Sequence, residues 1–139
     1  MSGTKVSQLP LKKIDIYTPS YEGGGGPDYY ISMTILSDGS FTGEYFGSSR
    51  TSCSGKFSSL KKVNEYCYTM VLSDYSGEDH GAFKVGSTFT LYMKDTPSSQ
   101  VSSKCMEDAG YKQGYLPNKL PGEMLWCENT GLACMNGVQ

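Results

Sequence analysis

Residues 31–46 read ISMTILSDGSFTGEYF, two alternating runs of apolar and polar side chains joined by the turn signal Ser37-Asp38-Gly39. A two-residue turn at Asp38-Gly39 would mix apolar and charged side chains on one face of the hairpin. A three-residue loop with Gly39 in the left-handed bulge position separates them. The pairs predicted by this loop are Ile35 with Phe41, Met33 with Gly43, and Ile31 with Tyr45. The pattern therefore predicts an antiparallel hairpin with one apolar face and one wet face.

The composition extends this prediction to the whole chain. Its 139 residues suit a single domain with a core of its own. The 17 glycines and 11 tyrosines, together with many Ser and Thr residues, favour short strands and turns over helices. We expect an all-β fold of antiparallel hairpins, forming a small lipocalin-like barrel or a strongly curved sheet. Closure into a barrel would also remove the edge strands.

Three regions can be distinguished along this single domain. Residues 1–10 are expected to be a disordered lead-in. Residues 11–97 hold the patterned segments and are expected to form the β core. Beyond residue 97 the pattern becomes irregular or short-helical, so residues 98–139 are expected to cover the core. Strands are predicted at residues 13–17 and 88–93, and a second hairpin at residues 53–57 and 65–72 with its turn within residues 58–64.

The predicted strand at residues 65–72 is apolar on both faces. Tyr68 and Met70 lie on one face, and Cys67 and Val71 lie on the other. A strand of this kind needs a covering layer on its outer side as well as a core on its inner side. The C-terminal region is the candidate for that layer.

The net charge argues against a nucleic-acid partner, and the hydropathy argues against a membrane-spanning helix. The formal net charge is -2 and the pI is about 5.3, so the chain offers no basic surface for nucleic acid. No window approaches the roughly 18 apolar residues that a membrane-spanning helix requires. The N-terminus has no apolar signal core either. We expect no nucleic-acid partner and no transmembrane segment.

The five cysteines form no C-x-x-C pair, which argues against structural zinc and thioredoxin-like chemistry. Two interpretations stay open: a disulfide framework made in an oxidising compartment, or thiols that never pair. In the first, Cys53 would lie opposite Cys67 if the second hairpin turned about Leu60. Cys127 and Cys134 would close a small loop. The odd count leaves at least one thiol free in a monomer.

The single histidine, His80, lies in a loop rich in carboxylates. Asp74, Glu78 and Asp79 are candidate metal ligands together with His80, because all four lie within reach of one ion. The spacing matches no known ligand loop, and the same composition is ordinary for a solvated turn. No Gly-x-Ser-x-Gly elbow or Cys-His signature accompanies the histidine. We therefore assign no catalytic residue, metal or cofactor.

Tyrosines are frequent in and beside the predicted strands. Aromatic side chains at such positions serve either as core or as a platform for a sugar or an apolar ligand. The candidate ligand-binding residues are Tyr45, Tyr66, Tyr68, Tyr92 and Trp126.

The order of the segments resembles a known group of proteins. The resemblance is carried by the residues DGSFTGEY at 38–45, CSGKF at 53–57, KKVNEYCYTM at 61–70 and GSTFTLYM at 86–93. It spans roughly residues 29–97, with a looser echo at residues 120–126. These segments resemble uncharacterised exported lipoproteins of Gram-positive gut anaerobes. The resemblance implies an extracytoplasmic, membrane-anchored setting at the cell surface, with a lipid-anchoring cysteine upstream of this sequence.

Three functions are compatible with these observations. The first is a non-catalytic extracytoplasmic module that binds a small molecule or a glycan through Tyr and Trp side chains. The second is a structural or protein-interaction domain of a cell-surface lipoprotein, partnered by a surface protein. The third is a metal-dependent or hydrolytic enzyme centred on His80. A deep aromatic cavity would favour the first, a filled interior the second, and an ion beside His80 the third.

Overall fold

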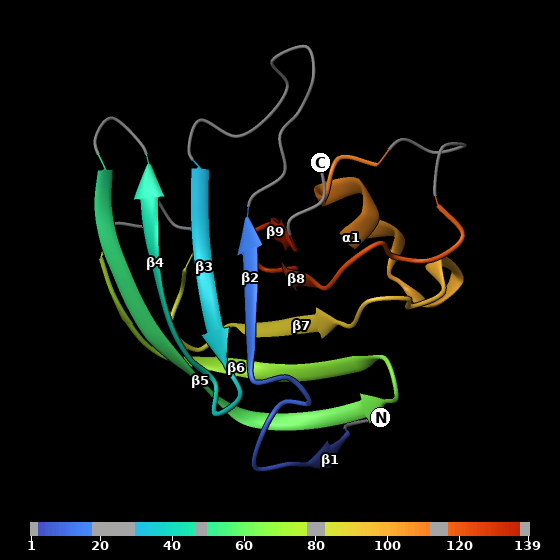
Figure 1. The fold of residues 1–139 in the computed structure, drawn as a ribbon, viewed down its shortest axis with the longest axis horizontal. Coiled ribbons are helices and arrows are strands. Elements are labelled where there is room, and N and C mark those ends of the chain that lie inside the picture. Colours follow the sequence, from blue (N-terminus) through green and yellow to red (C-terminus); the bar gives the residue numbers. More distant parts are fainter. Residues whose placement is uncertain (1–2, 18–29, 47–49, 78–82, 112–116, 137–139) are drawn as a thin grey trace.

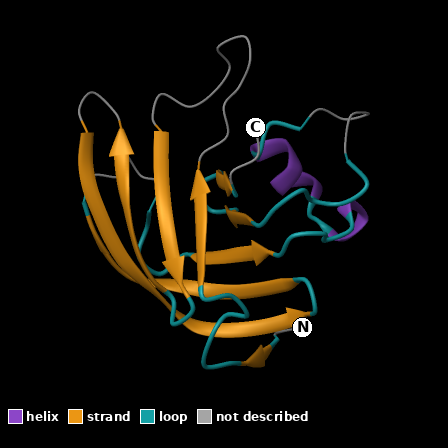
Figure 2. Cartoon of the chain, viewed as in Figure 1, coloured by secondary structure: helices purple, strands orange, loops and turns teal. Residues whose placement is uncertain are grey.

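A computed structural model describes residues 3–17, 30–46, 50–77, 83–111 and 117–136. In this part of the chain the fold is a closed, antiparallel barrel of eight strands with one extra strand, β1 (Figures 1 and 2). The strands are β1 (Thr4–Lys5), β2 (Lys13–Tyr17), β3 (Tyr30–Leu36), β4 (Ser40–Phe46), β5 (Arg50–Asn64), β6 (Cys67–Ser76), β7 (Thr88–Tyr92), β8 (Met124–Cys127) and β9 (Leu132–Met135). A 3-10 turn (Ser98–Gln100) and one α-helix, α1 (Ser103–Asp108), lie between β7 and β8.

The barrel has the simplest antiparallel connectivity. From β2 to β9 each strand pairs with the next strand in the sequence, and β9 returns to β2 where Met135 lies opposite Tyr17. This up-and-down order confirms the predicted lipocalin-like barrel. Among the described residues, no helix has the length and apolar character needed to cross a bilayer.

The first hairpin has the predicted register. β3 and β4 pair Ile35 with Phe41 and continue with the expected partners toward the barrel rim. Gly39 has a φ of 93° and donates its backbone N–H to the Leu36 carbonyl oxygen at 2.9 Å. A Cβ atom at Gly39 would collide with the Phe57 carbonyl oxygen. Glycine is therefore required here both for its backbone conformation and for the close approach of β5.

The second hairpin corrects the prediction. β5 does not turn within residues 58–64 but continues to Asn64, and the two-residue turn is Glu65-Tyr66. Three register shifts interrupt the pairing of β5 with β6, and Ser59 of β5 has a positive φ of 53°. Bulges of this kind bend a strand, so that β5 pairs with β4 along its first half and with β6 farther on. The bulges also break the period-two pattern from which the turn was placed.

The two ends of the chain also correct the prediction. Residues 3–10 are not a disordered lead-in, because β1 pairs with Lys61 and Lys62 of β5 and Leu9 is 4% exposed in the core. The C-terminal region is not only an irregular cover, because it supplies β8 and β9, the strands that close the barrel. Both are four residues long, and β8 is buried at every position, so neither shows an alternating pattern.

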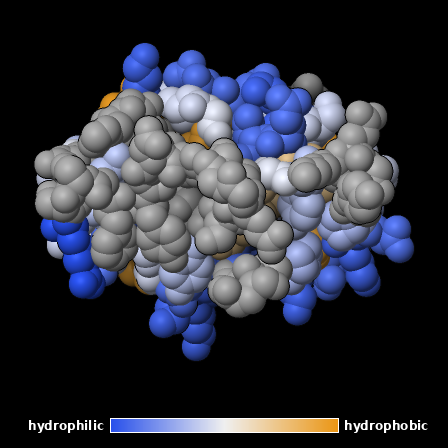
Figure 3. All heavy atoms as spheres, turned by 90° about the horizontal axis from the view of Figure 1, so that it is seen from above, coloured by the Kyte–Doolittle hydropathy of each residue, from blue (hydrophilic) through white to orange (hydrophobic). Residues whose placement is uncertain are grey.

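The interior of the barrel is filled by its own side chains. An aromatic group runs through it, with ring centroids 5.0 Å apart for Phe41 and Phe57 and 4.9 Å apart for Phe57 and Phe89. Phe83, from the segment before β7, stacks on Tyr75 at 4.7 Å and closes one side of this group. Apolar residues from all eight barrel strands belong to this cluster. The outer surface seen from above is mostly hydrophilic where it is coloured (Figure 3).

A second apolar cluster lies outside the barrel wall. It joins the outer faces of β7, β8 and β9 to residues of α1, including Cys105 and Met106. Cys67, on the outer side of β6, packs against the same cluster. The C-terminal segment therefore covers the outer side of the predicted two-faced strand at Cys67.

Candidate functional site

The five predicted aromatic site residues do not converge on one place. Tyr45 and Tyr68 are 0% and 6% exposed and belong to the packed barrel interior. Tyr92 and Trp126 belong to the outer cluster under α1. Tyr66 lies in the β5–β6 turn, where its backbone N–H donates to the Asn64 side chain at 2.8 Å. The five residues therefore do not form a single platform, and one of them, Trp126, lines the open groove described below.

The predicted pairing of Cys53 with Cys67 is wrong. Because β5 extends to Asn64, Cys67 lies opposite Asn64, while Cys53 lies farther along the barrel, opposite Gly43 of β4. Both are free thiols.

Cys127 and Cys134 lie on neighbouring strands but are also free thiols. The β8–β9 register places Cys127 opposite Leu132 and Cys134 opposite Leu125, so the two cysteines are offset from each other. Complete burial raises the pKa of the Cys134 thiol to about 12. This keeps the thiol protonated and unreactive at neutral pH. The disulfide argument for an oxidising compartment thus finds no support in the structure.

The predicted metal ligands are only partly described. Asp74 lies on β6 and is exposed, whereas Glu78, Asp79 and His80 lie outside the described residues. Where the structure describes the chain, no group of three or more His, Cys, Asp or Glu side chains could hold a metal ion.

An open groove runs along the outer wall beside Trp126. Its volume is about 800 Å³. It lies between the turn that precedes β7 and the turn that joins β8 to β9. Its lining includes Lys84, Val85, Thr88, Thr90, Trp126 and Glu128.

Strand register places the floor of this groove. Thr90 of β7 lies directly opposite Trp126 of β8, so both side chains point to the outer face. The walls are joined by a hydrogen bond in which the Asn129 amide donates to the Ser87 hydroxyl at 3.0 Å. These partners are 42 residues apart in the sequence, which is why sequence patterns gave no signal for the groove.

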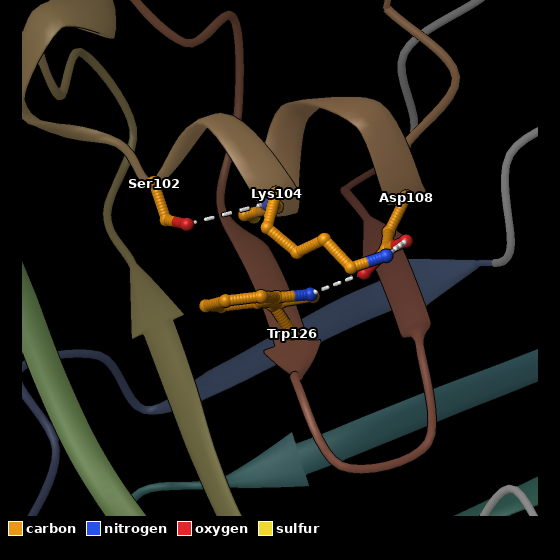
Figure 4. A network of polar contacts seen from close by, with 5 residues as sticks. Ser102, Lys104, Asp108 and Trp126 are labelled. Atoms are coloured by element: carbon orange, nitrogen blue, oxygen red, sulfur yellow. Dashed lines mark hydrogen bonds and ion pairs between the residues drawn. The ribbon is translucent and has the colours of Figure 1, made fainter.

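The helix α1 holds Trp126 in place. The indole nitrogen donates to an Asp108 carboxylate oxygen at 2.8 Å, and Figure 4 shows the ring lying beneath the helix with its nitrogen pointing to Asp108. Lys104, one turn earlier in α1, pairs with the other Asp108 oxygen at 3.1 Å. This hydrogen bond and ion pair raise the pKa of Lys104. Ser102 caps the helix by accepting from the Cys105 backbone N–H.

The chemistry of the groove is polar and close to neutral. Thr88 and Thr90 offer hydroxyls, and the exposed Lys84 and Glu128 offer one charge of each sign. Val85, which is 61% exposed, adds an apolar rim. Within the described lining no nucleophile is paired with a histidine base. The arrangement is suited to hydrogen bonding with a polar ligand.

A second, smaller groove of about 600 Å³ lies on the outer faces of β3, β4 and β5. Thr34, Thr42 and Ser54 form a row of hydroxyls across the three strands. Glu44 at this groove forms a two-pronged ion pair with Arg50, at 2.7 and 2.8 Å, which lowers the pKa of Glu44. The described lining of this groove contains no aromatic side chain.

Comparison with protein families, with curated proteins and with solved structures finds no match to this chain.

Proposed function

We propose that this barrel is a non-catalytic binding module that holds a small polar molecule or a glycan in the outer groove beside Trp126. The observation that carries the proposal is the groove itself. It is large enough for a small ligand, at about 800 Å³, and ligand sites commonly fall in the range of about 300–1,000 Å³. Trp126 and Thr90, which lie opposite each other, are among its lining residues, together with hydroxyl, amide and charged groups.

The proposal places the ligand outside the barrel rather than inside it. In lipocalin-like folds the barrel interior can hold a ligand when side chains leave room. Here the interior is occupied by Phe57, Phe89, Tyr45 and their neighbours, and each of these three side chains is fully buried. The near balance of charge around the groove favours a neutral, hydroxyl-rich ligand over a polyanion.

The proposed setting is extracytoplasmic, on a cell-surface lipoprotein. The support for this part of the proposal is the resemblance of residues 29–97 to exported lipoproteins. A sugar-binding groove on the outer wall would suit that setting, because it faces solvent.

Trp126 is the only tryptophan in the chain, so the intrinsic tryptophan fluorescence comes from a residue that lines the groove. We would titrate the protein with neutral oligosaccharides of glucose, galactose, mannose and N-acetylglucosamine. At least one series should change the emission in a saturable way. Thr90→Ala should then raise the Kd by about two- to tenfold, as expected for one lost hydrogen bond.

Thr42→Ala in the second groove is the matched control, because it removes an outward-facing threonine from the opposite wall of the barrel. It should leave the Kd unchanged. Absence of a saturable response to every neutral oligosaccharide would overturn the glycan proposal. An equal loss of affinity in both threonine variants would overturn the placement of the site.

The alternative proposal is a structural or protein-interaction domain, and the packed barrel interior favours it. Such a domain would bind no oligosaccharide but would retain a surface-protein partner. Two results together would support this alternative. No oligosaccharide would change the Trp126 fluorescence, and a protein partner would bind with an affinity that Thr90→Ala leaves unchanged.

A further inference from the structure

One end of the barrel gathers half of the basic side chains of the protein. Residues 3–13, 36–40 and 56–66 meet there, at the lower edge of Figure 1. Backbone hydrogen bonds join the three segments, since the Val6 N–H donates to Leu60 and the Leu9 N–H donates to Ser37. We call this surface the lysine end. Its six lysines are Lys5, Lys12, Lys13, Lys56, Lys61 and Lys62.

The charge of the chain is divided unevenly. The lysine end carries a net charge of +4, because its six lysines face only two carboxylates, Asp38 and Glu65. The whole chain carries -2, so the remaining residues carry -6. Five of the six lysines are exposed and Lys61 is half-buried. In the described part of the chain none of the six forms an ion pair. The lysine end therefore presents a positive field to solvent, which the net charge of the chain conceals.

Two of these lysines lie directly opposite each other. Lys5 of β1 pairs with Lys61 of β5, so both side chains leave the same face of the sheet, with Cβ atoms about 5 Å apart. Like charges at directly opposite positions destabilise a sheet. An anionic surface placed against this face would offset that repulsion.

Exposed apolar side chains lie among the lysines. Leu36 is 45% and Val63 is 41% exposed, and they are two of the three large hydrophobic residues that are exposed in the described chain. Leu36 lies opposite Lys13 in the β2–β3 register. Val63 follows the doublet Lys61-Lys62 in β5. Lysines with apolar neighbours bind an anionic bilayer through both charge and apolar burial, whereas a soluble polyanion would make no use of the apolar side chains.

We propose that the lysine end docks on a membrane surface that contains anionic phospholipid headgroups. The lysines would face the headgroup phosphates, and Leu36 and Val63 would enter the interfacial layer. This inference does not rest on the outer groove or on its ligand. In the lipoprotein setting proposed above, docking would hold β1 and its end of the barrel against the bilayer (Figure 1).

The test is co-sedimentation of the full chain with sucrose-loaded vesicles. One set of vesicles contains phosphatidylcholine alone, and the other contains phosphatidylcholine and phosphatidylglycerol in equal parts. We expect binding to the mixed vesicles at about 0.05 M salt and its loss at about 0.5 M, because the screening length falls from roughly 14 Å to roughly 4 Å. Binding to phosphatidylcholine alone should be weaker by at least about tenfold.

Two matched double variants locate the docking surface. Lys12→Gln with Lys61→Gln should weaken binding to the mixed vesicles by more than about tenfold, since each lysine near an anionic surface contributes about fivefold in affinity. Lys104→Gln with Lys119→Gln removes the same charge from α1 and from the loop before β8, and should change binding by less than about twofold. Lys61→Gln should not lower the urea midpoint, because it relieves the repulsion by Lys5.

Three outcomes would overturn the proposal. The first is no binding to the mixed vesicles at low salt. The second is equal weakening by the two double variants, which would assign the binding to net charge alone. The third is tight binding to the soluble polyanion poly-L-glutamate with none to vesicles, which would assign the lysine end to an acidic macromolecule in solution. The oligosaccharide titration of the outer groove is independent of all three.

Discussion

Asp108 accepts a hydrogen bond from the indole nitrogen of Trp126 at 2.8 Å, and this bond fastens α1 to β8. A helix of six residues is too short to be stable by itself. Its position on the barrel therefore depends on contacts such as this one and on the apolar cluster beneath it. The same bond orients the aromatic side chain that borders the outer groove.

Removing the Asp108 acceptor should loosen this attachment. Asp108→Ala leaves the largely buried indole N–H without its partner, and we expect a loss of about 1–3 kcal/mol in the free energy of unfolding. Urea unfolding followed by Trp126 fluorescence measures it. Lys104→Ala is the control, because an exposed ion pair contributes only about 0–1 kcal/mol. If Asp108→Ala and Lys104→Ala had the same free energy of unfolding, the indole hydrogen bond would not be what attaches α1 to β8.

Phe83 should be essential to the packed interior. It is 3% exposed and stacks on Tyr75, with Phe41 and Phe89 nearby. Phe83→Ala should lower the free energy of unfolding by about 3–5 kcal/mol, because it leaves a cavity among the rings. Val85→Ala, at a position 61% exposed two residues away, should change it by less than about 0.5 kcal/mol. A small effect of Phe83→Ala would contradict a filled barrel.

Alanine substitutions at Gly39 and Gly86 distinguish the stability cost of backbone strain from that of a steric collision. Both have a positive φ, of 93° and 96°, so alanine at either should cost about 1–2 kcal/mol of strain. At Gly86 nothing lies within 4 Å of the added Cβ, whereas at Gly39 it meets the Phe57 carbonyl. Denaturant unfolding should therefore show Gly39→Ala as clearly the more destabilising variant. Equal losses would mean that β5 can move away from the turn.

Stability should fall in alkali because of the buried thiol of Cys134. Its pKa is raised by burial from 9.0 to about 12. Between these values the unfolded chain releases the thiol proton while the folded chain keeps it. The contribution of the neutral Cys134 thiol to the free energy of unfolding is therefore complete below pH 9. It is lost as pH rises toward 12, by about 1.4 kcal/mol per pH unit.

Cys134→Ala tests the contribution of Cys134, because it removes one of the two thiols whose pKa is raised to about 12. Urea unfolding of both proteins between pH 7.5 and 10.5 should show a shallower alkaline decline for the variant. Identical slopes would show that Cys134 is not held as a neutral thiol. The comparison of slopes is independent of any constant loss of packing.

Where the sequence carries a regular period, it predicts this structure in detail. The β3–β4 register and the left-handed Gly39 followed from alternating side chains and one turn, since a shift of one residue would expose the apolar face. β2 was placed at its observed bounds for the same reason. β5 was misread because bulges set Phe57 and Leu60 three residues apart on one buried side.

The outer groove could not be predicted from such periodic patterns, because its residues come from segments far apart in the sequence. Its floor pairs Thr90 with Trp126 across strands joined by more than 30 residues of chain. The bond between Ser87 and Asn129 that joins its walls has no local signature. Trp126 was singled out as a ligand-binding residue, but its tie to Asp108 depends on where a short helix packs.

The most direct test of an outer-wall site is a nuclear magnetic resonance titration of the ¹⁵N-labelled protein with the oligosaccharide that gives the strongest fluorescence response. The indole resonance of Trp126 and the amides of Thr88, Thr90 and Glu128 should shift together, while those of Tyr45 and Phe57 stay in place. Shifts concentrated on the interior residues, with the Trp126 indole unmoved, would contradict the outer-wall site and place the ligand inside the barrel.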